Sequence, residues 1–161
     1  MPQVYVSIGS NIEPRRYISS GLDSMQQHFG GLILSSVYES EAVGFEGENF
    51  LNLVALFETD KIVTEVIAIL QQIETNNNRQ RLAGKRFSAR TLDLDILLYD
   101  DLVSDELAIP RDEILKYAFV LLPLSELAPD AKHPVTGQTY ADLWQTFDKT
   151  GQDLWRVEVL F

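Results

Sequence analysis

The sequence has no cysteine and only two histidines, His28 and His133, which lie far apart. Without cysteine the chain can form neither a disulfide nor a thiolate metal site, and two distant histidines do not favour a zinc enzyme. Long apolar runs are missing too, since no stretch approaches the roughly 20 residues of a membrane-spanning helix. The N-terminal stretch MPQVYVSIGSN lacks the basic start and apolar run of a signal peptide. We therefore expect a cytoplasmic protein that does not associate with a membrane.

Basic residues are scarce, with 13 Lys and Arg against 24 Asp and Glu and a net charge of −11. This balance does not favour a nucleic-acid binder, because such proteins carry excess positive charge to displace phosphate counterions. Five basic residues nevertheless fall within positions 79–90, where no acid occurs: Arg79, Arg81, Lys85, Arg86 and Arg90. This local cluster indicates a binding site for a small anion.

Repeats, low-complexity segments and Pro- or Ser-rich linkers are also missing from the sequence. A length of 161 residues, with 45% apolar and 23% charged residues, is typical of one soluble globular domain. We therefore expect residues 1–161 to form a single domain, and we expect that domain to be a monomer.

The spacing of the apolar residues predicts a regular order of strands and helices. The pattern predicts a strand at 3–11, a helix at 12–29, strands at 32–40 and 49–59, a helix at 62–75 and a strand at 91–99. This is the order of the ferredoxin-like split βαβ fold, an α+β fold in which two helices cover one face of an antiparallel sheet. Further helices are predicted at 113–127, despite Pro123, and at 140–147.

Two aspartates stand in the predicted strand TLDLDILLY, directly after the basic cluster. Alternation places the leucines of this strand on one face and Asp93 and Asp95 on the other, roughly 7 Å apart at about 3.3 Å of rise per residue. Two like charges at that distance repel each other, and a site that tolerates them usually offers a cation. Hard oxygen ligands favour Mg²⁺, which takes one or two protein carboxylates and completes its shell with water and substrate phosphates.

Each half of this pattern has an ordinary alternative. Two aspartates on the outer face of a sheet are often only a solvated surface, and a basic cluster is often only a solvated loop. Their adjacency in the sequence favours a site for metal-assisted chemistry on phosphate, with the substrate left open.

Four segments together resemble the 6-hydroxymethyl-7,8-dihydropterin pyrophosphokinase family of folate synthesis. They are RTLDLDILLYDD at 90–101, VSIGSN at 6–11, NFLN at 49–52, and IP at 109–110 followed by VLLPLSELAP at 120–129. The resemblance implies a ferredoxin-like fold of three layers, with helices on both sides of the sheet. It also implies transfer of the β,γ-pyrophosphoryl group of ATP to the hydroxymethyl oxygen of the pterin, with release of AMP and participation of two Mg²⁺ ions.

The resemblance also implies roles for individual residues. Asp93 and Asp95 match the metal ligands, and the catalytic group comprises these two aspartates together with Arg79, Arg81 and Arg90. The pterin side matches Ser40, Glu41, Val43, Gly44, Phe50, Asn52 and Phe119. The ATP side matches Gln71 and Glu74, on the inner side of the second helix, and Arg79, Arg81, Arg90, Ile96, Arg111 and Tyr117.

Departures from the family pattern fall mostly on the nucleotide side. RFSAR at 86–90 stands where the family usually has RWGPR, Arg111 follows Pro110 where the family has His, and Tyr117 replaces an arginine. An alternative therefore stays open, in which the chain is a pterin- or nucleotide-binding relative with little transferase activity. A general interaction module with this fold is a third and weaker hypothesis.

Overall fold

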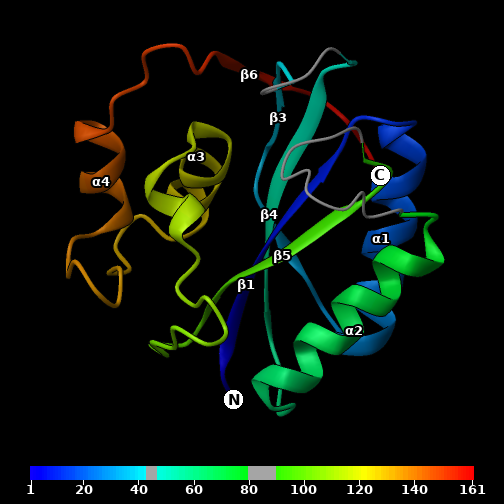
Figure 1. Cartoon of the computed structure of the whole chain (residues 1–161), viewed down its shortest axis with the longest axis horizontal. Helices are drawn as coiled ribbons and strands as arrows, with labels where there is room; N and C mark the ends of the chain where they lie inside the picture. Colours follow the sequence, from blue (N-terminus) through cyan, green and yellow to red (C-terminus); the bar gives the residue numbers. More distant parts are fainter. Residues whose placement is uncertain (43–46, 80–89) are drawn as a thin grey trace.

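The fold is built on one antiparallel sheet, seen in Figure 1 in a computed structural model that describes residues 1–42, 47–79 and 90–161. Within these ranges the sheet has six strands in the order β5-β1-β4-β3-β6, with β2 also paired to β4. The strands are β1 (Gln3–Ser10), β2 (Ile33–Leu34), β3 (Val37–Ser40), β4 (Phe50–Glu58), β5 (Asp93–Tyr99) and β6 (Leu154–Val157). The four predicted strands therefore pair as a ferredoxin-like sheet, and β6 extends it at one edge.

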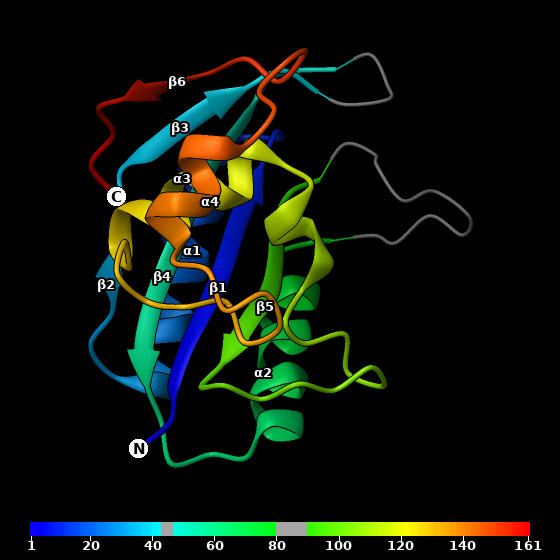
Figure 2. The same ribbon diagram turned by 90° about the vertical axis from the view of Figure 1, so that its left-hand side faces the viewer.

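Helices cover both faces of this sheet, as Figures 1 and 2 show from two sides. On one face lie α1 (Pro14–Phe29) and α2 (Val63–Asn76), and on the other lie α3 (Ala118–Leu127) and α4 (Tyr140–Thr146). A short 3-10 helix, η1 (Asp112–Leu115), precedes α3. The predicted α+β fold of three layers is confirmed. Across the described ranges, none of the helices has the length and apolar character needed to cross a bilayer.

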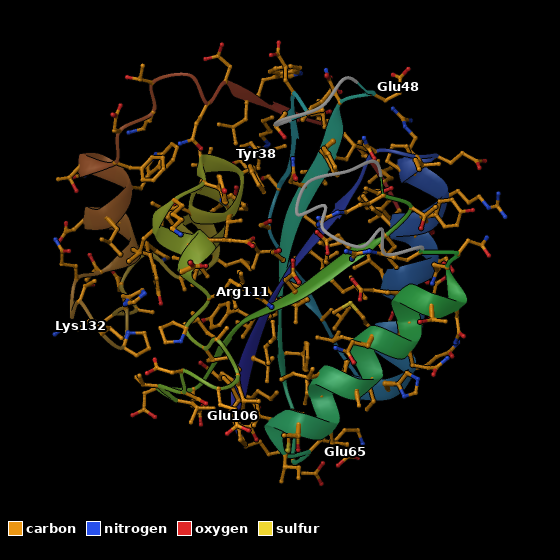
Figure 3. All side chains as sticks on the ribbon, viewed as in Figure 1. Tyr38, Glu48, Glu65, Glu106, Arg111 and Lys132 are labelled. Atoms are coloured by element: carbon orange, nitrogen blue, oxygen red, sulfur yellow. The ribbon has the colours of Figure 1, made fainter. Side chains whose placement is uncertain are left out.

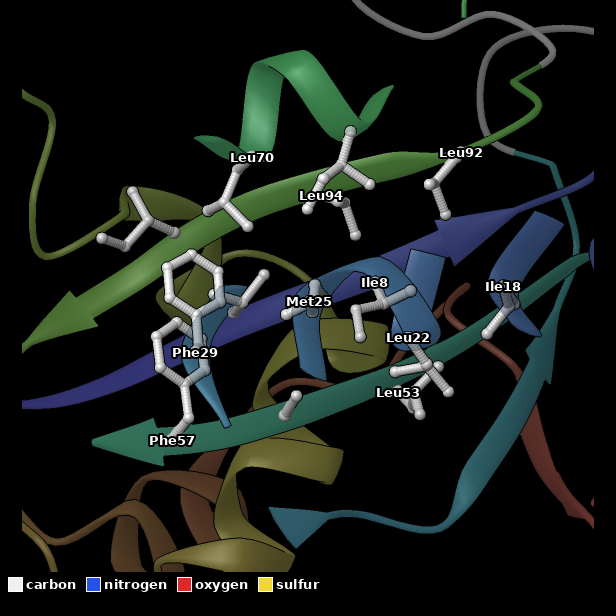
Figure 4. Close-up of a cluster of buried hydrophobic side chains, with 14 of the residues drawn as sticks. Ile8, Ile18, Leu22, Met25, Phe29, Leu53, Phe57, Leu70, Leu92 and Leu94 are labelled. Atoms are coloured by element: carbon white, nitrogen blue, oxygen red, sulfur yellow. The ribbon is translucent and has the colours of Figure 1, made fainter. Parts of the chain in front are cut away.

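The two faces of the sheet have separate apolar cores. Figure 4 shows the core under α1 and α2, where Met25, Leu53 and Leu94 pack together. The second core, under α3 and α4, contains Val54 and Leu121. Leu53 and its neighbour Val54 serve opposite cores because successive side chains of a strand alternate. Full burial of one such side chain stabilises the fold by about 1.5 to 3 kcal/mol.

Two predicted elements differ from the structure, and one strand of the structure was not predicted. The single strand predicted at 32–40 is broken at Ser35, whose hydroxyl accepts the Val54 N–H at 2.9 Å in place of a backbone carbonyl. The helix predicted at 113–127 is divided, because Tyr117 is extended, with φ −122° and ψ 126°. Strand β6 was not predicted. Its four residues are LWRV, and so short a run carries almost no periodic signal.

Candidate functional site

A row of residues crosses the sheet on the face that α3 covers. Gly9 of β1 pairs with Asn52 of β4 on one side and with Asp93 of β5 on the other, and Asn52 pairs in turn with Tyr38 of β3. Residues in register point to the same face, so these side chains share one surface. Asp95 follows in the next row on the same face, opposite Ser7. The two predicted aspartates therefore lie beside each other and close to the predicted pterin asparagine.

Gly9 leaves the middle of this row without a side chain. A Cβ atom at this position would stand 3.6 Å from Asn52 Oδ1 and 3.8 Å from a ring carbon of Phe50. The lack of a side chain at Gly9 thus leaves space between the asparagine and the aspartates. Phe50 and Asn52, two predicted pterin contacts, both border that space.

Asp93 is the centre of a compact charge cluster. One of its carboxylate oxygens accepts from Arg79 at 2.6 Å, and the other accepts from Arg90. Arg79 also pairs with Glu74, whose carboxylate, only 2% exposed, accepts the Leu94 N–H at 2.9 Å. Burial acts to raise the pKa of Asp93, but the charges of Arg90 and Arg79 outweigh it and hold this pKa below its ordinary value. Asp93 is therefore ionised, and it fixes both guanidinium groups at the start of β5.

The pKa of Asp95 is shifted in the opposite direction from that of Asp93. Burial and the neighbouring charge of Asp93 raise the pKa of Asp95 to about 7, although Arg111 opposes this rise. Arg111 approaches the carboxylate at 3.5 Å and donates from Nε to the Ile96 carbonyl at 3.3 Å. In Figure 3, Arg111 lies beside β5. A carboxyl group held close to neutral by a negative neighbour gains from an added cation, so this pair suits a divalent ion.

Three of the predicted pterin residues border a pocket of about 190 Å³ between the end of β3 and the start of α3. Ser40 and Glu41 line one side and Phe119 lines another. Asn52, 5% exposed, donates to the Ser40 hydroxyl at 2.9 Å and to the Tyr38 carbonyl at 3.2 Å. These bonds satisfy the amide nitrogen, as expected for a polar side chain within an apolar strand. The pocket and the aspartate pair therefore adjoin across Asn52.

One ring contact and one hydrogen bond hold α3 beside this pocket. Phe119 stacks on Tyr117 with ring centroids 5.2 Å apart and planes 19° from parallel. On the other side, the Tyr38 hydroxyl donates to Glu126 of α3 at 2.7 Å, and Figure 3 shows Tyr38 beside that helix. Tyr117, predicted to face the nucleotide, thus contacts Phe119 of the predicted pterin wall.

Other predicted residues have mixed outcomes. Gln71 is exposed and does not lie on the inner side of α2, because the buried stripe of that helix runs through Leu70, Ile73 and Glu74. The side chain of Ile96 packs in the core under α1 and α2, and only its carbonyl faces Arg111. Val43, Gly44 and Arg81 lie outside the described residues.

Two residues near the site were not predicted to take part. Asn11 accepts the Arg90 N–H at 2.6 Å and donates to the Glu48 carbonyl at 3.1 Å, so it joins the segments that precede β5 and β4. The sequence signal for Asn11 is the VSIGSN segment. Gln152 lines the pocket from the segment before β6, and nothing in the local sequence around it indicates such a role.

A family model described as 7,8-dihydro-6-hydroxymethylpterin-pyrophosphokinase (HPPK) matches residues 5–129. The chain belongs to the HPPK family. A Pseudomonas aeruginosa HPPK, named 2-amino-4-hydroxy-6-hydroxymethyldihydropteridine pyrophosphokinase, is 37% identical over 138 residues, which cover 82% of this chain and 84% of the relative. A Bacillus subtilis enzyme of the same name is 32% identical over 159 residues, covering 92% and 93%. The predicted family and the predicted pyrophosphokinase function are confirmed by these matches.

Solved structures agree with the fold. A crystal structure described as HPPK-DHPS in complex with substrates aligns with a TM-score of 0.70 and 12% identity. The alignment covers 90% of this chain but only 43% of that protein, so the chain spans less than half of its length. At this identity the likeness shows the HPPK fold alone.

Proposed function

We propose that the chain transfers the β,γ-diphosphate of ATP to the hydroxymethyl oxygen of 6-hydroxymethyl-7,8-dihydropterin, with Asp93 and Asp95 holding Mg²⁺. A new bond forms from this oxygen to the β-phosphorus, the bond from the β-phosphorus to AMP breaks, and the hydroxyl proton leaves to solvent. One observation carries the proposal. The aspartate pair and the pocket that Phe119 lines lie on one face of the sheet, joined through Gly9 and Asn52.

The donor set fits a magnesium ion. Asp93 and Asp95 offer hard oxygen ligands from adjacent positions of one strand face. When bound, Mg²⁺ would neutralise phosphate charge and act as a Lewis acid. In the described part of the chain, no group of three or more His, Cys, Asp or Glu gathers as a metal site, so the two aspartates would share the ion with water and substrate phosphates. The HPPK resemblance implies two such ions, and we propose that both contact this pair.

The guanidinium groups of Arg79 and Arg90 would bind the phosphates. Both are held in place by Asp93, and Arg79, at 8% side-chain exposure, is also held by Glu74. Cations fixed before the substrate arrives need little reorganisation as charge moves from the β-phosphorus to the leaving oxygen. Alignment of the two substrates and these fixed charges would supply the catalysis, so a side-chain nucleophile is not needed.

The pocket next to the aspartates would hold the pterin. A flat heterocycle can stack on Phe119, whose ring is already supported by Tyr117. Polar groups of the pterin edge would face Ser40 and Glu41, which line the pocket, and Asn52, which donates to the Ser40 hydroxyl. The hydroxymethyl group would then point across Gly9 toward the aspartates.

One observation favours the alternative of a binding relative with little transfer activity. Arg111 pairs with Asp95, while Arg79 and Arg90 pair with Asp93, so protein cations already balance the aspartates. A metal ion must compete with these contacts. If it competes poorly, the chain would bind pterin or nucleotide without efficient transfer.

Incubation of the purified protein with ATP, Mg²⁺ and the hydroxymethyl pterin, followed by chromatography of AMP, tests the proposal. We expect AMP to appear only when all three are present and to vanish with excess EDTA. Asp93→Ala and Asp95→Ala should abolish AMP formation, whereas Asp101→Asn, at an exposed position after β5, should not. Substantial activity in both alanine variants would contradict the assignment of Asp93 and Asp95 as metal ligands. If the wild type binds pterin but forms no AMP, this result would support the binding alternative.

We further propose that residues 1–161 act as one domain and as a monomer. Light scattering after size-exclusion chromatography at several protein concentrations checks the monomer. A mass that rises to twice the chain mass with concentration would contradict it.

A further inference from the structure

We propose that Gln152 is a positioning residue for the pterin pocket, acting through the start of α3 to fix the ring of Phe119. This inference rests on the proposed function, because it takes the pocket beside Phe119 to be the pterin site. Gln152 lies beyond residues 5–129, the part of the chain that the family model matches.

The side-chain amide of Gln152 forms hydrogen bonds with the backbone at two positions. Its Oε1 accepts the Ala118 N–H at 2.9 Å, and its Nε2 donates to the Lys116 carbonyl at 3.1 Å. Ala118 is the first residue of α3, and the first N–H groups of a helix have no partner within the helix. A Ser, Thr, Asp or Asn at the N-cap usually accepts from the second or third of these N–H groups, but here Tyr117 stands at the N-cap and its side chain makes no such bond. Gln152 therefore caps α3 from 34 residues away.

The two bonded residues, Lys116 and Ala118, lie on either side of Tyr117. The ring of Tyr117 stacks on that of Phe119. The two hydrogen bonds of Gln152, called the clamp below, therefore hold the short backbone segment from which both rings project. Phe119 in turn lines the pocket, and so do Gly151 to Leu154 of the clamping segment. Loosening these two hydrogen bonds would allow the aromatic wall formed by Phe119 to shift.

The clamping segment is itself anchored to the opposite wall of the pocket. In Figure 1 the chain leaves α4 and runs to β6, which pairs with β3. Leu154 stands opposite Ser40 in this pairing. The same segment therefore joins the wall of Ser40 to the wall of Phe119 and sets the distance between them.

The position of Gln152 on the surface makes this proposal testable. Its side chain is only partly buried and belongs to neither apolar core, so replacement should leave both cores intact. The charge cluster of Asp93, Arg79 and Arg90 lies at the start of β5, whereas Gln152 bonds the backbone at the start of α3. A change at Gln152 should therefore affect pterin binding and leave nucleotide binding unchanged.

Isothermal titration calorimetry separates these effects in two variants. Gln152→Ala removes both bonds and should weaken binding of the hydroxymethyl pterin about fivefold to tenfold, the effect of losing one helix cap. Gln152→Glu keeps the acceptor for Ala118 but loses the donor for Lys116, so its affinity should fall between those of Gln152→Ala and the wild type. Affinity for Mg²⁺ with a non-hydrolysable ATP analogue should stay within about twofold in both variants. Gln145→Ala, at an exposed position of α4, is the matched control and should bind like the wild type.

The outcomes distinguish this inference from the proposed function. A wild type that binds pterin, with Gln152→Ala binding equally well, would overturn the role of Gln152 and leave the proposed function standing. Equal losses of pterin and nucleotide affinity, together with a lower Tm, would show a merely structural role and would also overturn it. A wild type that does not bind pterin would overturn both. A raised KM for pterin at unchanged kcat in Gln152→Ala would support the inference.

Discussion

Replacement of Asp95 by asparagine should stabilise the protein at neutral pH, although the same change should abolish catalysis. Burial and the charge of Asp93 raise the pKa of Asp95 to about 7, against an ordinary value of 3.8. A carboxyl group with a higher pKa in the folded state holds its proton more tightly there than in the unfolded chain. Its contribution to stability is therefore present below the unfolded pKa and is lost as the pH rises toward the folded pKa.

The size of this effect follows from the pKa change. Each tenfold change in proton affinity is worth about 1.4 kcal/mol, so a rise from 3.8 to about 7 corresponds to about 4 kcal/mol. The side chain of Asp95 is 23% exposed, and water screens part of this penalty. We expect Asp95→Asn, which cannot ionise, to be about 2 to 3 kcal/mol more stable than the wild type near pH 8 and almost equal to it near pH 4.

Urea unfolding in the presence of EDTA, at pH values from about 4 to about 8, measures this difference. Asp93→Asn should behave in the opposite way and lose about 3 kcal/mol at neutral pH, because Arg79 and Arg90 would then face an amide instead of a carboxylate. Asp101→Asn, at an exposed position, controls for the loss of one negative charge. If Asp95→Asn and the wild type had the same stability at every pH, the electrostatic reasoning about this pair would be refuted.

Three further changes test other parts of the structure. Phe119→Ala should weaken pterin binding by about 1 to 2 kcal/mol through lost stacking, as calorimetry would show, and unchanged affinity would place the pterin elsewhere. Arg111→His combined with Tyr117→Arg should tighten binding of the magnesium complex of ATP by about 1.5 to 3 kcal/mol, and unchanged binding would show that a cation already fills the phosphate site. Gly21→Ala should cost about 1 to 3 kcal/mol in urea unfolding, because its Cβ would stand 2.8 Å from a methyl carbon of buried Leu92. Full stability would mean that this methyl group moves freely.

The fold and the face of the aspartates could be predicted from the sequence because both depend on local periodicity. Alternation in 91–99 is strict enough that Leu92 and Leu94 enter the core under α1 and α2 while Asp93 and Asp95 face the other side. Register with Gly9 and Asn52 then follows from the antiparallel pairing of β5, β1 and β4. The charge pattern also predicted that bases would lie near acids, but it did not predict which base meets which acid.

Predictions that depend on which face of a helix a residue occupies were less successful. Gln71 lies one residue after buried Leu70, and one position on a helix turns a side chain by about 100°, so a residue at the rim of the stripe can face either way. Tyr117 is a similar case. Its backbone is extended where helical periodicity predicts a continuous helix, and this conformation turns its ring onto Phe119.

The start of α3 could not be predicted because its cause is distant in the sequence. The apolar spacing of 113–127 continues through Tyr117 without a Gly or Pro before Pro123, so local signals favour one helix. In the structure, Gln152 accepts the Ala118 N–H and donates to the Lys116 carbonyl, which stabilises a break at the residue between them. The strand that follows Gln152 is likewise defined by its partner β3 rather than by its own four residues. The Phe119 wall of the proposed pterin pocket thus depends on one pair of tertiary hydrogen bonds. A relative that keeps every motif residue but changes its C-terminal segment should therefore have a different pterin affinity at the same affinity for nucleotide.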